Sequence, residues 1–107
     1  MSMLIEIDDS QFEEKVLKSA FPVLLDFSSP ECIICKTMKE RIKEVAVHFK
    51  GKVHFLSLDV NRNKIWQKFE VKAVPTIIYF KDGKAVFRHE IFPEKEEMVA
   101  HLQKLIK

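Results

Sequence analysis

Cysteine, histidine and glycine are all scarce in this chain, and each shortage argues against a class of site. Its 107 residues include two cysteines, Cys32 and Cys35, and four histidines that have no paired spacing. A structural zinc site takes four ligands, so one chain of this composition does not favour such a site. With only Gly51 and Gly83 present, the chain has no glycine-rich phosphate loop, and we expect neither a metal nor another bound cofactor.

Long hydrophobic runs and an excess of one charge are also missing. No stretch of about 18 apolar residues occurs, and the first residues lack a basic segment followed by an apolar one. We therefore expect no membrane span and no secretory signal, and we expect the protein to be cytoplasmic. The 18 basic and 16 acidic residues leave a formal net charge of +2, which is too balanced to favour nucleic-acid binding.

What is present is the composition of an ordinary folded domain. Hydrophobic residues make up 47% of the chain and charged residues 32%, which is typical of a globular protein rather than a disordered tail. A chain of this length buries a core without metals or disulfide staples, and it has no room for a second domain. The sequence thus predicts one domain that spans residues 1–107.

Strand-like and helix-like segments alternate along the chain in the order βαβαβαββα. The nearly continuous apolar run at residues 23–27 predicts a central strand that is covered on both faces. Ser10 and Glu13 form a capping box at the start of the first predicted helix. Asn61 is expected to cap a short helix, and Pro93 suits the first turn of the last one. A βαβ crossover followed by a hairpin predicts an α/β fold, with a central mixed sheet flanked by helices on both faces.

The segment Cys32-Ile33-Ile34-Cys35 follows a predicted strand and a short loop, and lies at the first turn of a long predicted helix. Free N–H groups and positive potential at a helix N-terminus stabilise a thiolate, which is the reactive form of cysteine. Two cysteines at this spacing are able to close a small disulfide. We therefore assign attack on a substrate disulfide to Cys32, and resolution of the mixed disulfide to Cys35.

Other interpretations of the two cysteines stay open from their spacing alone. In the first, the two cysteines are half of a zinc site that two subunits share. In the second, they are two core cysteines that lie on one helix by chance. A third interpretation is the serious alternative, in which the chain is a non-catalytic binding or scaffold module. That alternative predicts a disulfide that forms poorly or does not turn over.

Five sequence features occur together in this chain. They are Asp26 within the apolar run, Cys32-x-x-Cys35-Lys36, Leu58-Asp59-Val60, Val74-Pro75-Thr76 and Asp82-Gly83-Lys84. In this combination the chain resembles the thioredoxin family over nearly its whole length. The resemblance implies the thioredoxin fold and an enzyme that reduces protein disulfides through a redox-active cysteine pair, with a part in electron transport and cell redox homeostasis.

The resemblance also implies roles for residues outside the cysteine pair. In thioredoxins the aspartate that matches Asp26 lies beneath the disulfide and helps to move the proton of the resolving cysteine. We therefore expect a buried Asp26 with a raised pKa, the alternative being a carboxylate at a strand end that faces solvent. The family's matching proline is cis and lies against the cysteines, so the Val74–Pro75 bond is expected to be cis. The Val74 backbone is expected to pair with an extended client segment.

The motif departs from the Trp-Cys-Gly-Pro-Cys of typical thioredoxins. Glu31 places a negative charge next to Cys32, which disfavours the thiolate, whereas Ile34 has an N–H that is able to donate to the sulfur. Ile33 and Ile34 also stiffen the loop and add apolar surface around it. Because these effects oppose one another, the sequence favours neither a more reducing nor a less reducing couple than that of an ordinary thioredoxin.

Two further departures concern the surroundings of the motif. Ser57 replaces a lysine that often pairs with the buried aspartate in the family, so Asp26 is expected to lack a cation and to be harder to ionise. The segment Lys39-Glu40-Arg41 replaces the family's usual proline, so the helix that follows Cys35 is expected to run straighter.

The resemblance also implies partners. Disulfide-containing proteins are the expected clients, and a thioredoxin-reductase-like protein or another dithiol is the expected electron donor. We expect a monomer that binds neither nucleic acid nor a membrane. The residues expected to contact clients are Val74, Pro75, Ile33, Ile34 and Ile91. The segment that contains Ile91 replaces a glycine-containing turn, and it either ends a packed strand or makes the client groove more apolar.

Overall fold

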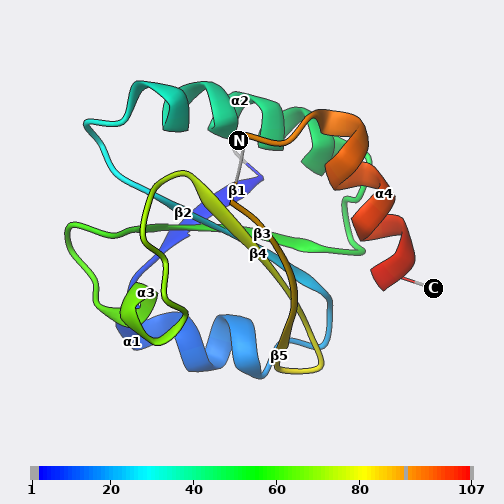
Figure 1. Cartoon of the computed structure of the whole chain (residues 1–107). Coiled ribbons are helices and arrows are strands. Elements are labelled where there is room, and N and C mark those ends of the chain that lie inside the picture. Colours follow the sequence, from blue (N-terminus) through cyan, green and yellow to red (C-terminus); the bar gives the residue numbers. More distant parts are fainter. Residues whose placement is uncertain (1–2, 91, 107) are drawn as a thin grey trace.

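A five-stranded mixed sheet forms the centre of the computed structural model, which describes residues 3–90 and 92–106 (Figure 1). The strands are β1 (Leu4–Ile7), β2 (Val23–Ser28), β3 (His54–Asp59), β4 (Thr76–Lys81) and β5 (Lys84–His89), and their order across the sheet is β1-β3-β2-β4-β5. Strand β3 is parallel to both β1 and β2, whereas β4 is antiparallel to both β2 and β5. This sheet confirms the predicted α/β fold.

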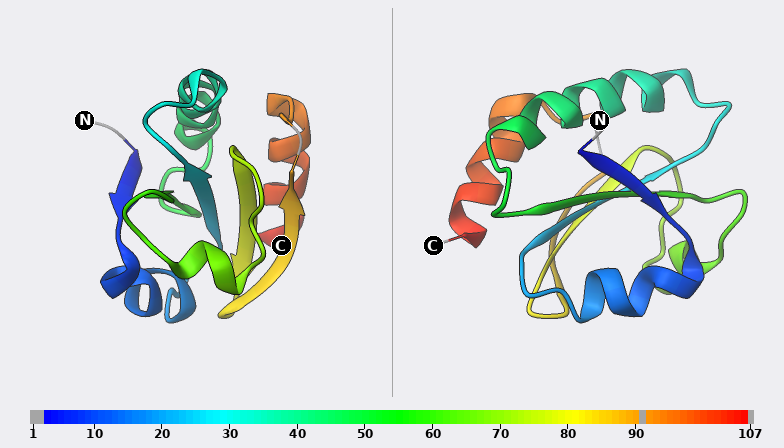
Figure 2. Two further views of the ribbon diagram at one scale, coloured as in Figure 1. Left: turned by 60° about the vertical axis from the view of Figure 1, so that its left-hand side comes forward. Right: turned by 180° about the vertical axis from the view of Figure 1, so that it is seen from behind.

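Helices cover both faces of the sheet (Figures 1 and 2). One face carries α1 (Asp9–Phe12), the π-helical turn η1 (Glu13–Leu17) and α3 (Ile65–Lys68), and the other face carries α2 (Ile33–Val47) and α4 (Lys95–Leu105). Along the chain these elements follow the predicted order. Among the described residues, no helix is long and apolar enough to cross a membrane.

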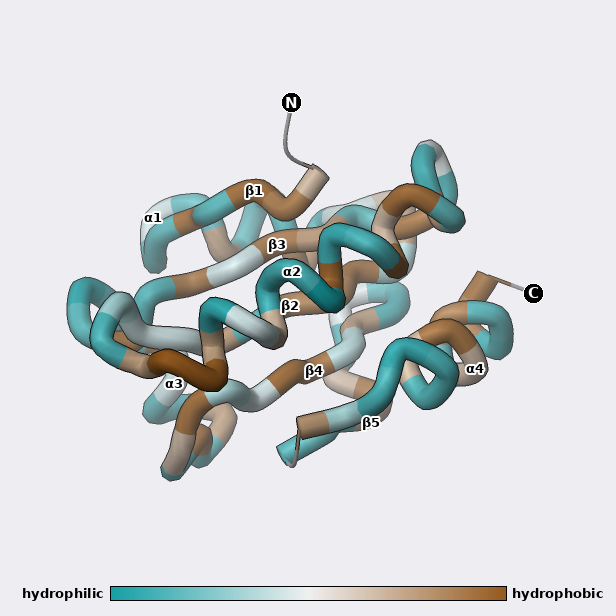
Figure 3. The backbone as a smooth tube through the Cα atoms, turned by 90° about the horizontal axis from the view of Figure 1, so that it is seen from above, coloured by the Kyte–Doolittle hydropathy of each residue, from teal (hydrophilic) through white to brown (hydrophobic). Residues whose placement is uncertain are grey.

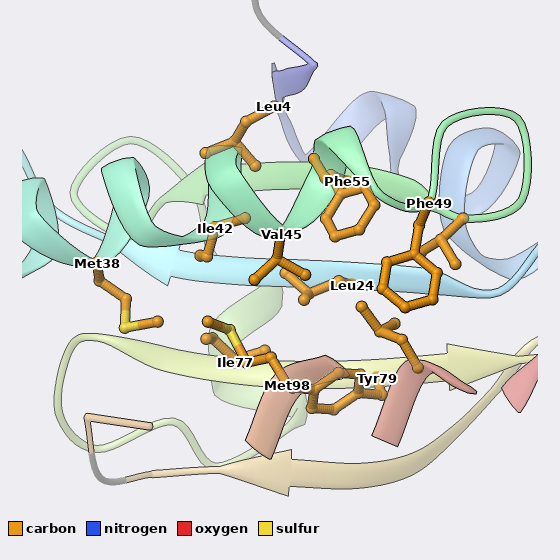
Figure 4. Close-up of a cluster of buried hydrophobic side chains, with 13 residues drawn as sticks. Leu4, Leu24, Met38, Ile42, Val45, Phe49, Phe55, Ile77, Tyr79 and Met98 are labelled. Atoms are coloured by element: carbon orange, nitrogen blue, oxygen red, sulfur yellow. The ribbon is translucent and has the colours of Figure 1, made fainter. Parts of the chain in front are cut away.

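Strand β2 lies at the centre of both hydrophobic cores. All six of its residues are buried, which is why its sequence is a nearly continuous apolar run. Leu24 packs in the cluster beneath α2 and α4, where Figure 4 shows it facing Ile42 and Val45 of α2. Leu25 packs in the second cluster, on the opposite face of the sheet. Because side chains alternate along a strand, Asp26 points to the same face as Leu24, towards α2.

Two helix starts differ from the prediction because other residues satisfy their free N–H groups. The N-cap of α1 is Asp8 rather than Ser10, since Asp8 Oδ1 accepts a hydrogen bond from the Ser10 amide at 2.9 Å. The Gln11 side chain completes the capping box by accepting from the Asp8 amide at 3.1 Å. The N-cap of α4 is Glu94, so Pro93 lies before the helix and not in its first turn.

The short helix α3 begins through a contact with α1, and the predicted Asn61 cap is wrong. The backbone amides of Lys64 and Ile65 donate to the two carboxylate oxygens of Asp9 at 2.6 and 3.0 Å. The Asp9 amide donates in turn to Asn63 Oδ1 at 2.7 Å. These bonds join the start of α1 to the start of α3, so the Asn61 side chain is not needed there.

A tight turn at Asp82 and Gly83 joins β4 to β5, as the sequence predicts. Their φ angles are 53° and 78°, which are the positive values that such hairpin turns need. A Cβ atom at Gly83 would lie 2.8 Å from the carbonyl oxygen of Leu17. Glycine therefore allows the hairpin to pack closely against the end of η1.

Candidate active site

Cys32 and Cys35 lie at the open N-terminal end of α2. Cys32 is the N-cap residue, and its sulfur accepts a hydrogen bond from the Cys35 amide at 3.1 Å. The two cysteines form a disulfide, with their Cα atoms 5.2 Å apart. Cys35 is fully buried, whereas Cys32 is partly exposed. When the pair is reduced, this amide and the free N–H groups of the first turn stabilise negative charge on the more accessible Cys32 sulfur.

The Val74–Pro75 segment lies against this cysteine pair. Its peptide bond is cis, which confirms the prediction, and the Val74 carbonyl oxygen is 3.9 Å from Cys32 Sγ. Strand pairing explains the approach of two segments that are 42 positions apart. Strand β4 starts directly after Pro75 and is antiparallel to β2, so its beginning lies beside the end of β2, which leads into the Cys32 loop.

The surface around Cys32 is apolar. The exposed fractions of Ile33 and Ile34 are 79% and 56%, which is unusual for large aliphatic side chains. Figure 3 shows this start of α2 as a strongly hydrophobic stretch of the backbone tube. Val74 and Pro75 are partly exposed, so an incoming chain has access to them. Ile91, the last of the residues predicted to contact clients, lies outside the described residues.

Asp26 is the buried titratable group of the site. It is fully buried, and its Oδ1 has no hydrogen-bond partner in the described part of the chain. Burial raises the pKa of Asp26 to about 6, and the nearby ammonium group of Lys39 partly opposes this shift. A buried carboxyl with a raised pKa is thereby confirmed, and the alternative of an aspartate that faces solvent is wrong.

The expectation that Asp26 lacks a cation is also wrong. Lys39 Nζ donates a hydrogen bond to Asp26 Oδ2 at 3.3 Å. The sequence prediction considers only the neighbouring strand, where Ser57 pairs with Asp26 and carries no charge. Lys39 comes instead from α2, four residues after Cys35 and therefore on the same side of the helix. A lysine at that spacing, above a strand with a buried acid, is the signal that would find this pair.

A cavity of about 420 Å³ lies beside the same groups. Its lining residues are Glu6, Ser28, Ser29, Pro30, Cys35, Lys36, Lys39, Ser57 and Asp59. The Lys39 side chain is 31% exposed, whereas its partner Asp26 is fully buried. Lys39 therefore extends from the buried carboxyl towards water, next to the residue that carries the inner sulfur.

Glu31 is held in place by a neighbouring loop. Asn61 Nδ2 donates to both carboxylate oxygens of Glu31, at 2.7 and 2.8 Å. Asn61 follows β3, so this contact ties the loop that precedes Cys32 to the next strand of the sheet. The negative charge that the sequence places beside Cys32 is therefore fixed by a specific partner. Sequence reasoning misses this role because it uses Asn61 as a helix cap.

Two histidines that are far apart in the sequence meet between β5 and α4. The ring centres of His89 and His101 are 5.2 Å apart, and the His101 ring stacks on Phe87. His89 Nδ1 is 3.1 Å from the hydroxyl oxygen of the buried Tyr79. Across residues 3–90 and 92–106, no group of three histidine, cysteine or acidic side chains is arranged to hold a metal ion.

Comparison with known proteins gives a consistent result. A family model described as Thioredoxin matches residues 3–104 of the chain. The thioredoxin of Haemophilus influenzae is 37% identical over 87 residues, which cover 80% of this chain and 81% of the relative. The thioredoxin of Staphylococcus haemolyticus is 35% identical over 102 residues, which cover 94% and 96%. That of Rickettsia felis is 37% identical over 82 residues, which cover 76% and 78%.

Proposed function

Because this chain belongs to the thioredoxin family of thiol–disulfide oxidoreductases, we propose that it reduces disulfide bonds in other proteins through Cys32 and Cys35. One observation carries the proposal. The Cys32 sulfur lies at the open end of α2 and 3.9 Å from the carbonyl oxygen of Val74, beside the cis proline. A client disulfide that approaches Cys32 therefore meets an activated sulfur and an exposed backbone acceptor together.

The proposed reaction begins with the dithiol form of the protein. The Cys32 thiolate attacks one sulfur of the client disulfide, so a mixed disulfide forms and the other client sulfur leaves as a thiolate that takes up a proton. The Cys35 thiol then loses its proton and attacks the Cys32 sulfur. The first client sulfur leaves, and the Cys32–Cys35 disulfide forms. That sulfur also takes up a proton, so the client has gained two electrons and two protons, while the protein has released its two thiol protons, one when the Cys32 thiolate formed and one from Cys35.

Asp26 is the group proposed to take the proton of Cys35. Its pKa of about 6 leaves the carboxylate mostly ionised at neutral pH, yet basic enough to accept a proton during the second attack. Lys39 keeps it in this range, because its positive charge opposes the effect of burial. The cavity that Cys35 and Lys39 line supports an exchange of this proton with water.

Clients are proposed to dock as extended segments. The backbone of Val74 offers a carbonyl group beside Cys32, which suits pairing with the main chain of a client. Ile33, Ile34, Pro75 and Ile91 are proposed to contact the client side chains next to its disulfide. The two exposed isoleucines favour clients that carry apolar residues there.

The catalytic cycle needs an external reductant, because each turnover leaves the Cys32–Cys35 pair oxidised. We propose a thioredoxin-reductase-like protein or another dithiol in this role, and no bound cofactor. We further propose a cytoplasmic monomer that works as a single domain, and that contributes to electron transport and redox homeostasis.

Insulin reduction by dithiothreitol tests the proposal. Wild-type protein should accelerate the reaction, and Cys32→Ser should abolish the acceleration. In a separate reaction without dithiothreitol, which would itself cleave the product, reduced Cys35→Ser should accumulate a mixed disulfide with insulin that is detectable by mass spectrometry, because the second attack is missing. Lys43→Met is the matched control, because it removes an exposed lysine of α2 that does not line the cavity beside Cys35. Equal rates with wild type and Cys32→Ser would refute the proposal and favour the scaffold alternative.

A further inference from the structure

Arg41 of α2 makes three contacts with the segment at residues 92–94, which directly precedes α4. Its guanidinium carbon lies 4.1 Å from the centre of the Phe92 ring, in cation–π geometry. Its Nη1 donates to the Pro93 carbonyl oxygen at 2.5 Å and lies 3.8 Å from Glu94 Oε2. The Arg41 side chain is only 19% exposed. One side chain thus fixes three consecutive residues.

The register of the sheet places the end of β5, which precedes this segment in the chain, next to the start of β4 at the candidate active site. Strands β4 and β5 are antiparallel, and His89 at the end of β5 pairs with Ile77 near the start of β4. Pro75 precedes Ile77 by two residues, so the chain leaves β5 on the side where Pro75 enters β4. Figure 2 shows the end of β5 beside the beginning of β4. Phe92 also packs against the hydrophobic cluster beneath α2.

We propose that Arg41 is a positioning residue for client recognition, which holds the 92–94 segment as a preformed wall beside Val74 and Pro75. This inference rests on the proposed reduction of protein disulfides. A wall that is already ordered lowers the conformational entropy that a client must remove when it docks. A small disulfide that needs no docking surface gains nothing from that order. Arg41 therefore acts on protein clients, and not on the chemistry of Cys32.

Kinetics with two disulfides test this role. The dithiol form of the protein is mixed with a range of insulin concentrations, and separately with dithiobis(nitrobenzoic acid). We expect Arg41→Met to raise the half-saturating insulin concentration about threefold to tenfold, the range that a lost cation–π contact and a lost hydrogen bond give. The limiting rate and the rate with the small disulfide should stay unchanged. Arg41→Lys should restore part of the affinity, because it keeps a cation near Phe92.

Lys95→Met is the matched control for a merely structural role. Lys95 Nζ is 2.7 Å from Glu44 Oε1, so this pair also joins α4 to α2, but its ion pair is with Glu44 and not with a residue of the 92–94 segment. We expect Lys95→Met to leave the half-saturating insulin concentration unchanged, even where thermal unfolding shows that both variants lose stability. Equal increases in the two variants, or no increase in Arg41→Met, would overturn the proposal.

Two further outcomes also contradict it. A parallel loss of rate with the small disulfide in Arg41→Met would show that Arg41 affects the Cys32 chemistry itself. Wild-type protein that reduces the small disulfide but not insulin would refute the reduction of protein disulfides, and the role of Arg41 with it. This last outcome differs from failure of the Arg41 proposal alone, in which wild type and Arg41→Met reduce insulin equally well.

Discussion

Replacing Asp26 with asparagine is expected to stabilise the folded protein at neutral pH, and much less at acidic pH. Burial raises the pKa of Asp26 from the usual 3.8 to about 6. Between these values the folded state binds a proton that the unfolded state has lost, so the free energy of unfolding falls as pH rises through this range. One pKa unit corresponds to about 1.4 kcal/mol, so ionised Asp26 destabilises the folded protein by about 3 kcal/mol above about pH 6.

Guanidinium unfolding of the oxidised wild type and of Asp26→Asn, at about pH 8 and about pH 4, measures this difference. We expect the variant to gain up to about 3 kcal/mol at the higher pH and less than about 1 kcal/mol at the lower. Ser28→Ala is the matched control, since it removes another buried polar group from the same side of β2 but no titrating group. A gain in Asp26→Asn that is equal at both pH values would refute the reasoning.

Two more substitutions follow from single contacts. Lys39→Met should raise the pKa of Asp26 above about 6, as observed by NMR titration of the carboxyl carbon, because the variant lacks the ammonium group that donates to Asp26 Oδ2 and opposes the effect of burial. Lys36→Met, from the same cavity, should leave that pKa unchanged. Gly83→Ala should lower the free energy of unfolding by at least about 1 kcal/mol, because its φ is positive and its Cβ would meet the Leu17 carbonyl oxygen. Gly51→Ala, also at positive φ but with nothing nearby, should cost less in the same unfolding experiment.

The strands could be predicted from the sequence because their signals are local. The apolar run of β2 indicates burial on both faces of the sheet, and the pair of Asp82 and Gly83 indicates the hairpin turn. The helix starts were predicted less well, since any nearby acceptor satisfies a free N–H group. For α3 that acceptor is Asp9, which lies more than fifty positions earlier in the chain. No local pattern contains such a partner.

In the candidate active site, too, the sequence predicts the features that lie in local motifs but not the contacts between distant elements. The cysteine pair and the cis proline belong to short motifs, so the resemblance to the thioredoxin family predicts both. Lys39 and Asn61 were missed as partners of Asp26 and Glu31, because each contact joins side chains from different elements. Sequence gives the position of a side chain on its own helix or loop. It does not give the neighbour that the fold places opposite.

The unbroken course of α2 links two of these contacts. Lys39 and Arg41 are two residues apart, which in an α-helix turns their side chains about 200° from each other. Lys39 therefore faces Asp26 beneath the helix, while Arg41 faces Phe92 on the other side. A proline at position 40 would remove a helical hydrogen bond and bend α2 between them. Glu40→Pro should thus disturb both contacts together, whereas a change at Lys39 or Arg41 disturbs only one.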